Sequence, residues 1–332
     1  MRPSPIRIAI NGFGRIGRTI LRLLSQDPRD FEIVLINDVA PLDTCAYLFK
    51  YDSIAGPFQG TVTTGPEALI VNGMSIPFHN CADLGELDLN GVDVVLECTG
   101  TANTAHTAQA GLRAGADAIL ISGPSDAAEI TLVIGANEIS LESQSIISNG
   151  SCTTNALAPL LRVLDDAFGV LSAQMTTVHC YTGSQPTIDA PRDDLARSRA
   201  AALSMVPTTT SAARLIDKVL PKLSGLIEAR AIRVPTASVS SIDLTLLIKT
   251  ETTSADVNAV LKANTLVSPV LGWCEDAVVS CDLRGRPASL TICPAETSLA
   301  PGGLLRVFGW YDNESGFSNR MLDMARLIAR RT

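Results

Sequence analysis

The stretch Gly12-Phe13-Gly14-Arg15-Ile16-Gly17 decides the fold, because it sets Gly-x-Gly-x-x-Gly between a strand-like run and a helix-like run. Ile6 to Asn11 before it is predicted to be a strand, and Arg15 to Ser25 after it a helix. Glycines at this spacing allow a tight turn and bring backbone N–H groups close to a pyrophosphate, which the helix N-terminus also attracts. Alone the pattern is weak, since an ordinary strand–helix turn can also produce it.

The next predicted strand strengthens this interpretation. Phe31 to Asn37 is followed by Asp38, about 20 residues past the last glycine, where an acid is expected to bind the ribose hydroxyls of a dinucleotide. A carboxylate there would repel the additional 2′-phosphate of NADP. The sequence therefore predicts an NAD site, with an unrelated Asp38 as the alternative.

Outward from this loop, strands and helices alternate. Val92 to Cys98 and Ala118 to Ser122 are predicted strands, separated by a helical stretch from Ala102 to Ala114. This alternation predicts an α/β fold with a doubly wound, mostly parallel sheet of the Rossmann type. Gly60 to Phe78, which contains an Asn72-Gly73 turn, is predicted to be an antiparallel excursion.

The pattern changes near Asn149-Gly150, between a predicted strand at 145–148 and a predicted helix at 153–168. Longer predicted strands follow at 170–178, 229–234, 239–249, 289–293 and 304–311, with helices at 211–219 and 254–263. We expect an NAD-binding domain at 1–151, completed by a C-terminal helix at 316–332, and an α+β catalytic domain at 152–315. The second domain should have a mainly antiparallel sheet. A length of 332 residues suits two cores.

Composition excludes several classes of protein. Hydrophobic residues make up 46% and charged residues 18%, as in packed globular proteins. A net charge of −8 argues against a nucleic-acid partner. No stretch is long and apolar enough for a membrane span, and no secretory peptide is recognised, so a cytoplasmic location is expected. None of the eight cysteines forms a Cys-x-x-Cys pair, so no metal site is predicted.

Cys152 stands at a predicted helix start, in Ser151-Cys152-Thr153-Thr154-Asn155. The positive end of a helix lowers the pKa of a thiol and stabilises a nearby oxyanion. Such a thiol needs a base, and among the three histidines His179 ends a strand from which it could project toward Cys152. Taken alone, such a pair is more often a buried apolar cysteine and a hydrogen-bonded core histidine. The dinucleotide loop favours the catalytic interpretation.

Several long motifs occur along the chain: I-N-G-F-G-R-I-G-R (10–18), K-Y-D-S (50–53), E-C-T-G (97–100), S-C-T-T-N (151–155), T-T-V-H (176–179), P-T-T-T (207–210), R-V-P-T (233–236) and W-Y-D-N-E (310–314). In this order, over nearly the whole chain, they resemble phosphorylating glyceraldehyde-3-phosphate dehydrogenases. Motifs of this length and order are highly specific.

The resemblance implies a reaction and a set of contacts. Cys152 would attack the aldehyde to give a thiohemiacetal, oxidation by NAD would leave a thioester, and inorganic phosphate would release an acyl phosphate, with His179 assisting proton transfer. The cofactor contacts would be the loop residues Gly12, Phe13, Gly14, Arg15, Ile16 and Gly17, together with Asp38, Ser122 and Asn313, the last holding the nicotinamide amide. Two anion sites would be formed by Thr182 with Arg233, and by Ser151, Thr153, Arg197, Thr210 and Ser211.

Departures from the family pattern concern the substrate. After His179 the family usually has Ala-Tyr-Thr-Asn-Asp-Gln, whereas this chain has Cys180-Tyr181-Thr182-Gly183-Ser184-Gln185. Ser211 stands where Gly is usual. These changes leave open another phosphorylated aldehyde, such as erythrose 4-phosphate, and a non-catalytic nucleotide-sensing paralogue remains a further alternative. The resemblance also implies a homotetramer.

Overall fold

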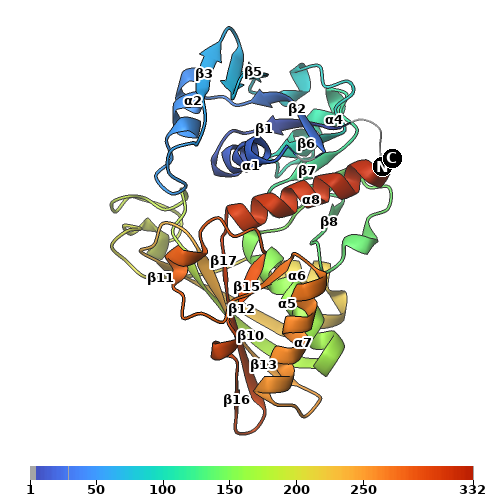
Figure 1. Ribbon diagram of the computed structural model, residues 1–332, viewed down its shortest axis with the longest axis vertical. Helices are drawn as coiled ribbons and strands as arrows, with labels where there is room; N and C mark the ends of the chain where they lie inside the picture. The colour runs from blue at the N-terminus through green and yellow to red at the C-terminus, as the bar shows by residue number, and fades with distance from the viewer. Residues whose placement is uncertain (1–4, 29, 332) are drawn as a thin grey trace. The chain divides into compact units, whose positions relative to one another are not determined.

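The computed structural model describes residues 5–28 and 30–331 (Figure 1). Its described residues form two compact units. Unit 1 contains the residues up to Leu132, then 139–150, and those from Ser318 onward. Unit 2 contains 133–138 and 151–317. Each unit is built around its own sheet.

The sheet of unit 1 has nine strands in the order β3-β4-β5-β2-β1-β6-β7-β9-β8. The strands are β1 (Ile6–Asn11), β2 (Phe31–Asn37), β3 (Val62–Gly65), β4 (Ala68–Val71), β5 (Met74–His79), β6 (Val94–Glu97), β7 (Ile119–Ile121), β8 (Ile130–Thr131) and β9 (Ile146–Ser148). All neighbours pair in parallel except β3 with β4 and β4 with β5. The predicted parallel sheet and its antiparallel excursion are confirmed, and the turn at Asn72-Gly73 has the positive φ angles that such hairpins require.

Unit 1 contains the helices α1 (Arg15–Gln26), α2 (Leu42–Lys50), α3 (Ala105–Ala108) and α4 (Ala110–Arg113), and from Ser318 onward α8 (Ser315–Arg331). The prediction of one helical stretch from Ala102 to Ala114 is wrong in detail. Thr104 caps α3 in a reciprocal arrangement with Thr107, which fixes the helix start at Ala105. Gln109 then ends α3 and begins α4, so the segment forms two short helices.

The sheet of unit 2 has eight strands, in the order β11-β12-β10-β13-β17-β15-β14 with β16 paired to β17. The strands are β10 (Val170–Cys180), β11 (Val206–Thr208), β12 (Ile227–Val234), β13 (Ser240–Ile248), β14 (Leu271–Trp273), β15 (Leu290–Ile292), β16 (Ser298–Ala300) and β17 (Leu304–Tyr311). Among the described strands of this sheet, only the pairs β10–β12 and β14–β15 are parallel, and the other pairs are antiparallel. The predicted, mainly antiparallel sheet is confirmed.

Three helices belong to unit 2, α5 (Cys152–Phe168), α6 (Ala212–Val219) and α7 (Ser254–Val267) (Figure 1). Short 3₁₀ turns lie at Leu84–Glu86, Glu138–Ser140, Ala196–Ser198, Pro221–Leu223, Ser280–Leu283 and Pro294–Glu296. Leu157, Leu161 and Leu164 of α5 are fully buried in one core with Met175 of β10 and Leu244 of β13. This packing fixes the N-terminus of α5 against the sheet, because the whole length of the helix is anchored.

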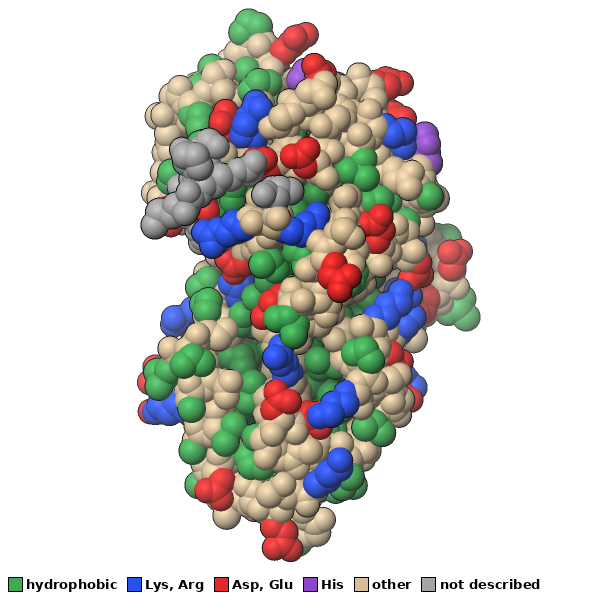
Figure 2. Space-filling model, turned by 90° about the vertical axis from the view of Figure 1, so that its right-hand side faces the viewer, with side chains coloured by type: hydrophobic (Ala, Val, Ile, Leu, Met, Phe, Trp, Pro, Cys, Tyr) green, Lys and Arg blue, Asp and Glu red, His purple; other side chains and the backbone are tan. Residues whose placement is uncertain are grey.

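The described residues show two general features, in their surface charge and in the composition of their helices. On the face drawn in Figure 2, basic and acidic side chains of the described residues are intermixed rather than separated by sign. None of the helices in the described part of the chain has both the length and the apolar composition needed to cross a bilayer.

Candidate active site

The glycine loop lies at the carboxyl end of β1, between β2 and β6. The N–H of Gly12 donates to the carbonyl of Asn37 at 2.8 Å, and Gly12 has a φ of +92°. A Cβ at Gly12 would come within 2.6 Å of the Cys98 backbone, and a Cβ at Gly17 would collide with the Gly12 carbonyl. A Cβ at Gly14 would meet nothing within 4 Å. Gly12 and Gly17 therefore serve packing within the loop, whereas Gly14 borders open space.

Asp38 is fixed by the same loop. One carboxylate oxygen accepts from the N–H of Phe13 at 2.6 Å, and the other accepts from the N–H of Ala40 at 2.8 Å. A cavity of about 510 Å³ opens here, bordered by Gly12, Gly14 and Asp38. The N-cap of α1 is Gly14, which has no side chain to accept from the first turn, so a bound anion can take the place that a capping side chain has in other helices. The residues present therefore fit a dinucleotide, with a helix N-terminus for its pyrophosphate and a carboxylate for a ribose.

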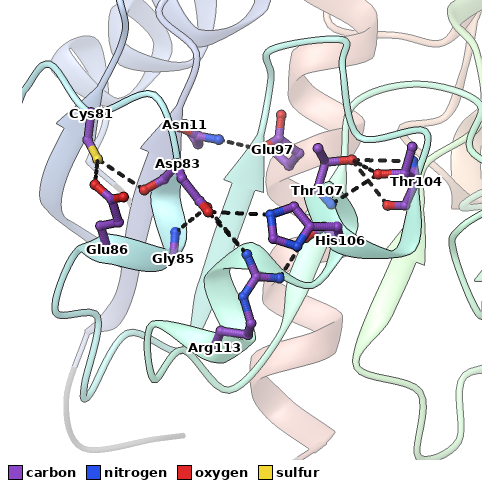
Figure 3. A network of polar contacts seen from close by, with 10 residues as sticks. All are labelled: Asn11, Cys81, Asp83, Gly85, Glu86, Glu97, Thr104, His106, Thr107 and Arg113. Carbon is purple, nitrogen blue, oxygen red and sulfur yellow. Dashed lines mark hydrogen bonds and ion pairs between the residues drawn. The ribbon is translucent and has the colours of Figure 1, made fainter.

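A polar network lines the deeper wall of this cavity (Figure 3). Buried Glu97 is held by the amide of Asn11 and by the hydroxyl and N–H of Thr99, while burial raises the pKa of its carboxyl. Nearer the rim, Asp83 contacts His106 at 3.4 Å and Arg113 at 3.3 Å. Asp83 thus already has the Arg113 guanidinium and the His106 ring as partners.

The remaining predicted cofactor residues are not among those that border the cavity. The Phe13 ring is buried against Phe49, so Phe13 can offer a ligand only its backbone. Arg15 forms an ion pair with Asp52. Ile16 and Gly17 lie in the first turn of α1. The N–H of Ser122 donates to the Glu97 carbonyl at 2.9 Å. Asn313 belongs to unit 2.

In unit 2, Cys152 is the first residue of α5. The Ser151 hydroxyl accepts from the N–H of Thr154 at 3.0 Å and caps the helix. The N–H groups of Cys152 and Thr153 lack acceptors within the helix because they belong to its first turn. These N–H groups can stabilise negative charge that develops on an oxygen bound beside the Cys152 sulfur.

His179 lies beside this thiol. Its Nε2 is 3.8 Å from the Cys152 Sγ. Its Nδ1 is 2.7 Å from the Cys180 carbonyl oxygen, which can only accept, and 2.9 Å from Nη1 of Arg233, which can only donate. We assign the ring proton to Nδ1 on the shorter of these two contacts. Nη1 of Arg233 donates to the same carbonyl at 2.9 Å. The unprotonated Nε2 therefore faces the sulfur, as a general base requires.

Burial determines the charge of both groups. Burial and the Arg233 guanidinium lower the pKa of His179 to about 4. Burial raises the pKa of the Cys152 thiol, and Arg233 with the hydrogen bonds at the start of α5 only partly counteracts this shift, so the lowered pKa expected from the helix start is wrong. The pair is therefore a neutral imidazole and a neutral thiol at pH 7, and the base must take the proton as the sulfur attacks.

Tyr311 connects α5 to β10 beneath the thiol. Its hydroxyl lies 2.9 Å from the Thr153 hydroxyl and 2.8 Å from the Thr177 hydroxyl, and its ring meets that of His179 edge-on at 6.0 Å. Neither Tyr311 nor Thr177 was predicted to be a site residue. Thr177 lies in the motif at 176–179 and Tyr311 in the motif at 310–314, and these motifs were the sequence evidence that could have indicated a role for them.

A second cavity, of about 300 Å³, surrounds Cys152 and His179. The residues that border it are Ser151, Cys152, Thr153, Thr177, His179, Arg197, Thr209, Thr210, Ser211, Ala231 and Arg233. Ser151 to Thr153 begin α5, and Thr210 and Ser211 precede α6, so two helix N-termini and two arginines converge on one cavity. Each of these elements attracts an anion.

The structure thus brings together all the predicted anion-site residues except Thr182. The Thr182 hydroxyl instead pairs with that of Ser184 at 2.9 Å and does not border the cavity. Arg197 is held by the Thr208 hydroxyl at 2.6 Å and the Thr209 carbonyl at 3.2 Å.

Comparisons with known proteins agree along the chain. The family model described as "Glyceraldehyde 3-phosphate dehydrogenase, NAD binding domain" matches residues 6–105, and the model described as "Glyceraldehyde 3-phosphate dehydrogenase, C-terminal domain" matches 151–313. The chain is 44% identical to the glyceraldehyde-3-phosphate dehydrogenase of Xanthobacter flavus, covering 96% of this chain and 97% of that protein. It is also 44% identical to the enzyme of that name from Cereibacter sphaeroides, covering 98% and 99%, and 41% identical to glyceraldehyde-3-phosphate dehydrogenase 1 of Bacillus subtilis, covering 98% and 99%. With its dinucleotide cavity and its Cys152–His179 pair, the chain belongs to the glyceraldehyde 3-phosphate dehydrogenase family.

Proposed function

We propose that this protein catalyses the NAD-dependent oxidation and phosphorylation of glyceraldehyde 3-phosphate to 1,3-bisphosphoglycerate. The observation that carries this proposal is the cavity around Cys152, which places a thiol, a neutral base, two arginines and two helix N-termini together. A phosphorylated aldehyde and inorganic phosphate are both anions that this set of groups can hold. The names of the related proteins favour this aldehyde over erythrose 4-phosphate.

Cys152 and His179 are the proposed catalytic residues. Nε2 of His179 accepts the thiol proton while the sulfur bonds to the aldehyde carbon, and it then returns that proton to the former carbonyl oxygen, which gives a thiohemiacetal. The N–H groups that begin α5 stabilise the oxygen as it gains charge. NAD, when bound, supplies the hydride acceptor for the oxidation that leaves a thioester on Cys152. His179 takes the hydroxyl proton in that step.

The release step uses the anion-binding groups. Inorganic phosphate held by the cavity attacks the thioester carbon and the carbon–sulfur bond breaks. The departing sulfur takes the proton held by His179, which regenerates the thiol and the neutral base and leaves an acyl phosphate as product. We assign one anion to Arg233 with Thr182, and the other to Ser151, Thr153, Arg197, Thr210 and Ser211. Arg197 supports this role because Thr208 and Thr209 preorganise its guanidinium at the cavity wall.

We assign cofactor binding to Gly12, Phe13, Gly14, Arg15, Ile16, Gly17, Asp38, Ser122 and Asn313. Asp38 carries the preference for NAD, through its charge. The dinucleotide-binding domain is proposed to comprise residues 1–151 with the helix at 316–332, and the catalytic domain residues 152–315. The two compact units support this division.

The purified protein tests the proposal directly. NADH should form when NAD, glyceraldehyde 3-phosphate and phosphate are all present, and omission of phosphate should stop turnover after one equivalent per site. Cys152→Ser should abolish both the turnover and the single equivalent. A Cys152→Ser variant with activity near wild type would overturn the covalent route, and a higher kcat/KM for erythrose 4-phosphate would overturn the substrate assignment.

We also propose that the protein acts in the cytoplasm as a homotetramer. The eight cysteines are all unpaired, which suits a reducing compartment. One side of the unit 2 sheet carries a groove of about 950 Å³, bordered by Leu226, Leu247 and Leu304, each more than a third exposed. Such apolar surface suits contact with a second copy. Light scattering coupled to size-exclusion chromatography should give four times the mass of the 35.0 kDa chain, and the mass of a single chain would refute this assignment.

A further inference from the structure

Cys180 lies at the junction of the catalytic groups of unit 2. It ends β10 directly after His179 and is fully buried. Its carbonyl accepts from Nδ1 of His179 at 2.7 Å and from Arg233 at 2.9 Å, and its N–H donates to the Ser240 hydroxyl at 3.1 Å. Its Sγ lies 3.1 Å from Oδ1 of Asn313. The backbone of Cys180 therefore serves the base and the anion site, while its thiol contacts Asn313.

The thiol is the donor in the contact with Asn313. Burial raises the pKa of Cys180 to about 12, so the sulfur keeps its proton at pH 7. Oδ1 of Asn313 is a carbonyl-type oxygen and can only accept. The Cys180 S–H therefore donates to Oδ1 of Asn313, and this contact determines which side of the Asn313 amide carries the oxygen and which carries the nitrogen.

The backbone around Asn313 is fixed independently. Asp312 is buried, and one of its carboxylate oxygens accepts from the N–H groups of Glu314 and Ser315 at 2.9 Å each. Its other oxygen accepts from the N–H of Gly285 at 2.8 Å. Only the rotation of the Asn313 side chain remains to be set, and Cys180 supplies the contact that sets it.

We propose that Cys180 is a positioning residue for the nicotinamide cofactor: by binding Oδ1 of Asn313, it turns the Asn313 Nδ2 outward as a donor to the carboxamide oxygen of NAD. Nδ2 has no partner among the described residues, so it is available for a ligand. The inference rests on the proposed function, in which Asn313 holds the nicotinamide amide.

A mutant cycle on NAD binding tests the proposal. Cys180→Ala keeps the backbone contacts and removes the thiol, and it should raise the Kd for NAD about fivefold, the effect of one neutral hydrogen bond. Cys180→Ser restores a donor and should recover most of the affinity. Binding is measured by calorimetry, so the result does not depend on turnover.

Asn313→Ala supplies the second side of the cycle. It should raise the Kd at least as much as Cys180→Ala, and the double variant should bind NAD no more weakly than Asn313→Ala alone. Cys293→Ala, which removes another buried cysteine of unit 2, is the matched control and should leave the Kd unchanged. Thermal unfolding establishes that each variant is folded.

The outcomes separate the positioning role from the function it serves. Additive effects of the two substitutions, or a Cys180→Ala variant that binds NAD like wild type while Asn313→Ala does not, would overturn the role of Cys180. An Asn313→Ala variant with wild-type affinity would overturn the contact itself. A protein that binds NAD as expected but does not oxidise glyceraldehyde 3-phosphate would refute the proposed function. The NAD affinities of the Cys180 and Asn313 variants would still test the positioning role, because they are measured without turnover.

Discussion

Acid should destabilise this protein through His179, and the size of the effect follows from its burial. The imidazole is 6% exposed, and its pKa is lowered from 6.5 to about 4. Between these values the unfolded chain binds a proton that the folded chain does not, so stability is complete above pH 6.5 and falls as the pH decreases toward 4. One pKa unit corresponds to about 1.4 kcal/mol, so the loss attributable to His179 is about 3 kcal/mol.

The measurement is urea unfolding of wild type and His179→Gln at a series of pH values from 7 to 4, followed by circular dichroism. Glutamine keeps a side chain of similar length without a titrating group, so the difference between the two proteins isolates His179. Wild type should lose about 3 kcal/mol more than the variant over this interval, with no further divergence below pH 4. A difference that stays constant from pH 7 to pH 4 would refute the buried neutral imidazole and, with it, the assignment of Nε2 as the base.

Three further predictions concern the loop and the two anion-binding regions. Gly17→Ala should lower the unfolding temperature by about 3–10 °C, because its Cβ collides with the Gly12 carbonyl. Gly14→Ala should leave the unfolding temperature unchanged and weaken NAD binding. Equal effects of the two substitutions on the unfolding temperature would contradict the roles assigned to the two glycines. Asp38→Asn removes the charge that repels a 2′-phosphate. The ratio of kcat/KM for NADP to kcat/KM for NAD should therefore rise at least about tenfold. An unchanged ratio, measured by formation of NADH and NADPH, would show that this charge does not set the cofactor preference. Arg197→Gln should raise KM about tenfold or more for glyceraldehyde 3-phosphate or for phosphate while KM for NAD stays constant; steady-state kinetics that leave both anion KM values unchanged would exclude Arg197 from the anion site.

Local patterns sufficed for much of the fold. The strand, glycine loop and helix from Ile6 to Gln26 follow from spacing alone, because each segment has its own periodicity and its own termination signal. Helix α2 (Leu42–Lys50) was not predicted. It is short, begins after a proline with no side-chain cap, and buries only Cys45, Ala46 and Phe49, so its sequence carries little signal.

The candidate site divides in the same way. Cys152 was predictable because a helix start changes the chemistry of a neighbouring thiol, and this is visible in sequence. The contact between His179 and Arg233 was not, because it depends on the parallel register of β10 and β12, which pairs these two residues directly. The contact between Cys180 and Asn313 joins residues 133 positions apart, and no local pattern indicates it.

The assignment of α8 to unit 1 has a consequence for how the protein is made. Unit 1 includes residues 139–150 and then nothing until Ser318, so a ribosome must add roughly 170 residues before the unit can be completed, or roughly 10–30 s of synthesis. During that time the partners of the buried Met321, Met324 and Ile328 remain uncovered on the nascent chain. Ribosome stalling within unit 2 would therefore leave an apolar surface from unit 1 accessible to chaperones and proteases, although the nine strands of its sheet have already been synthesised.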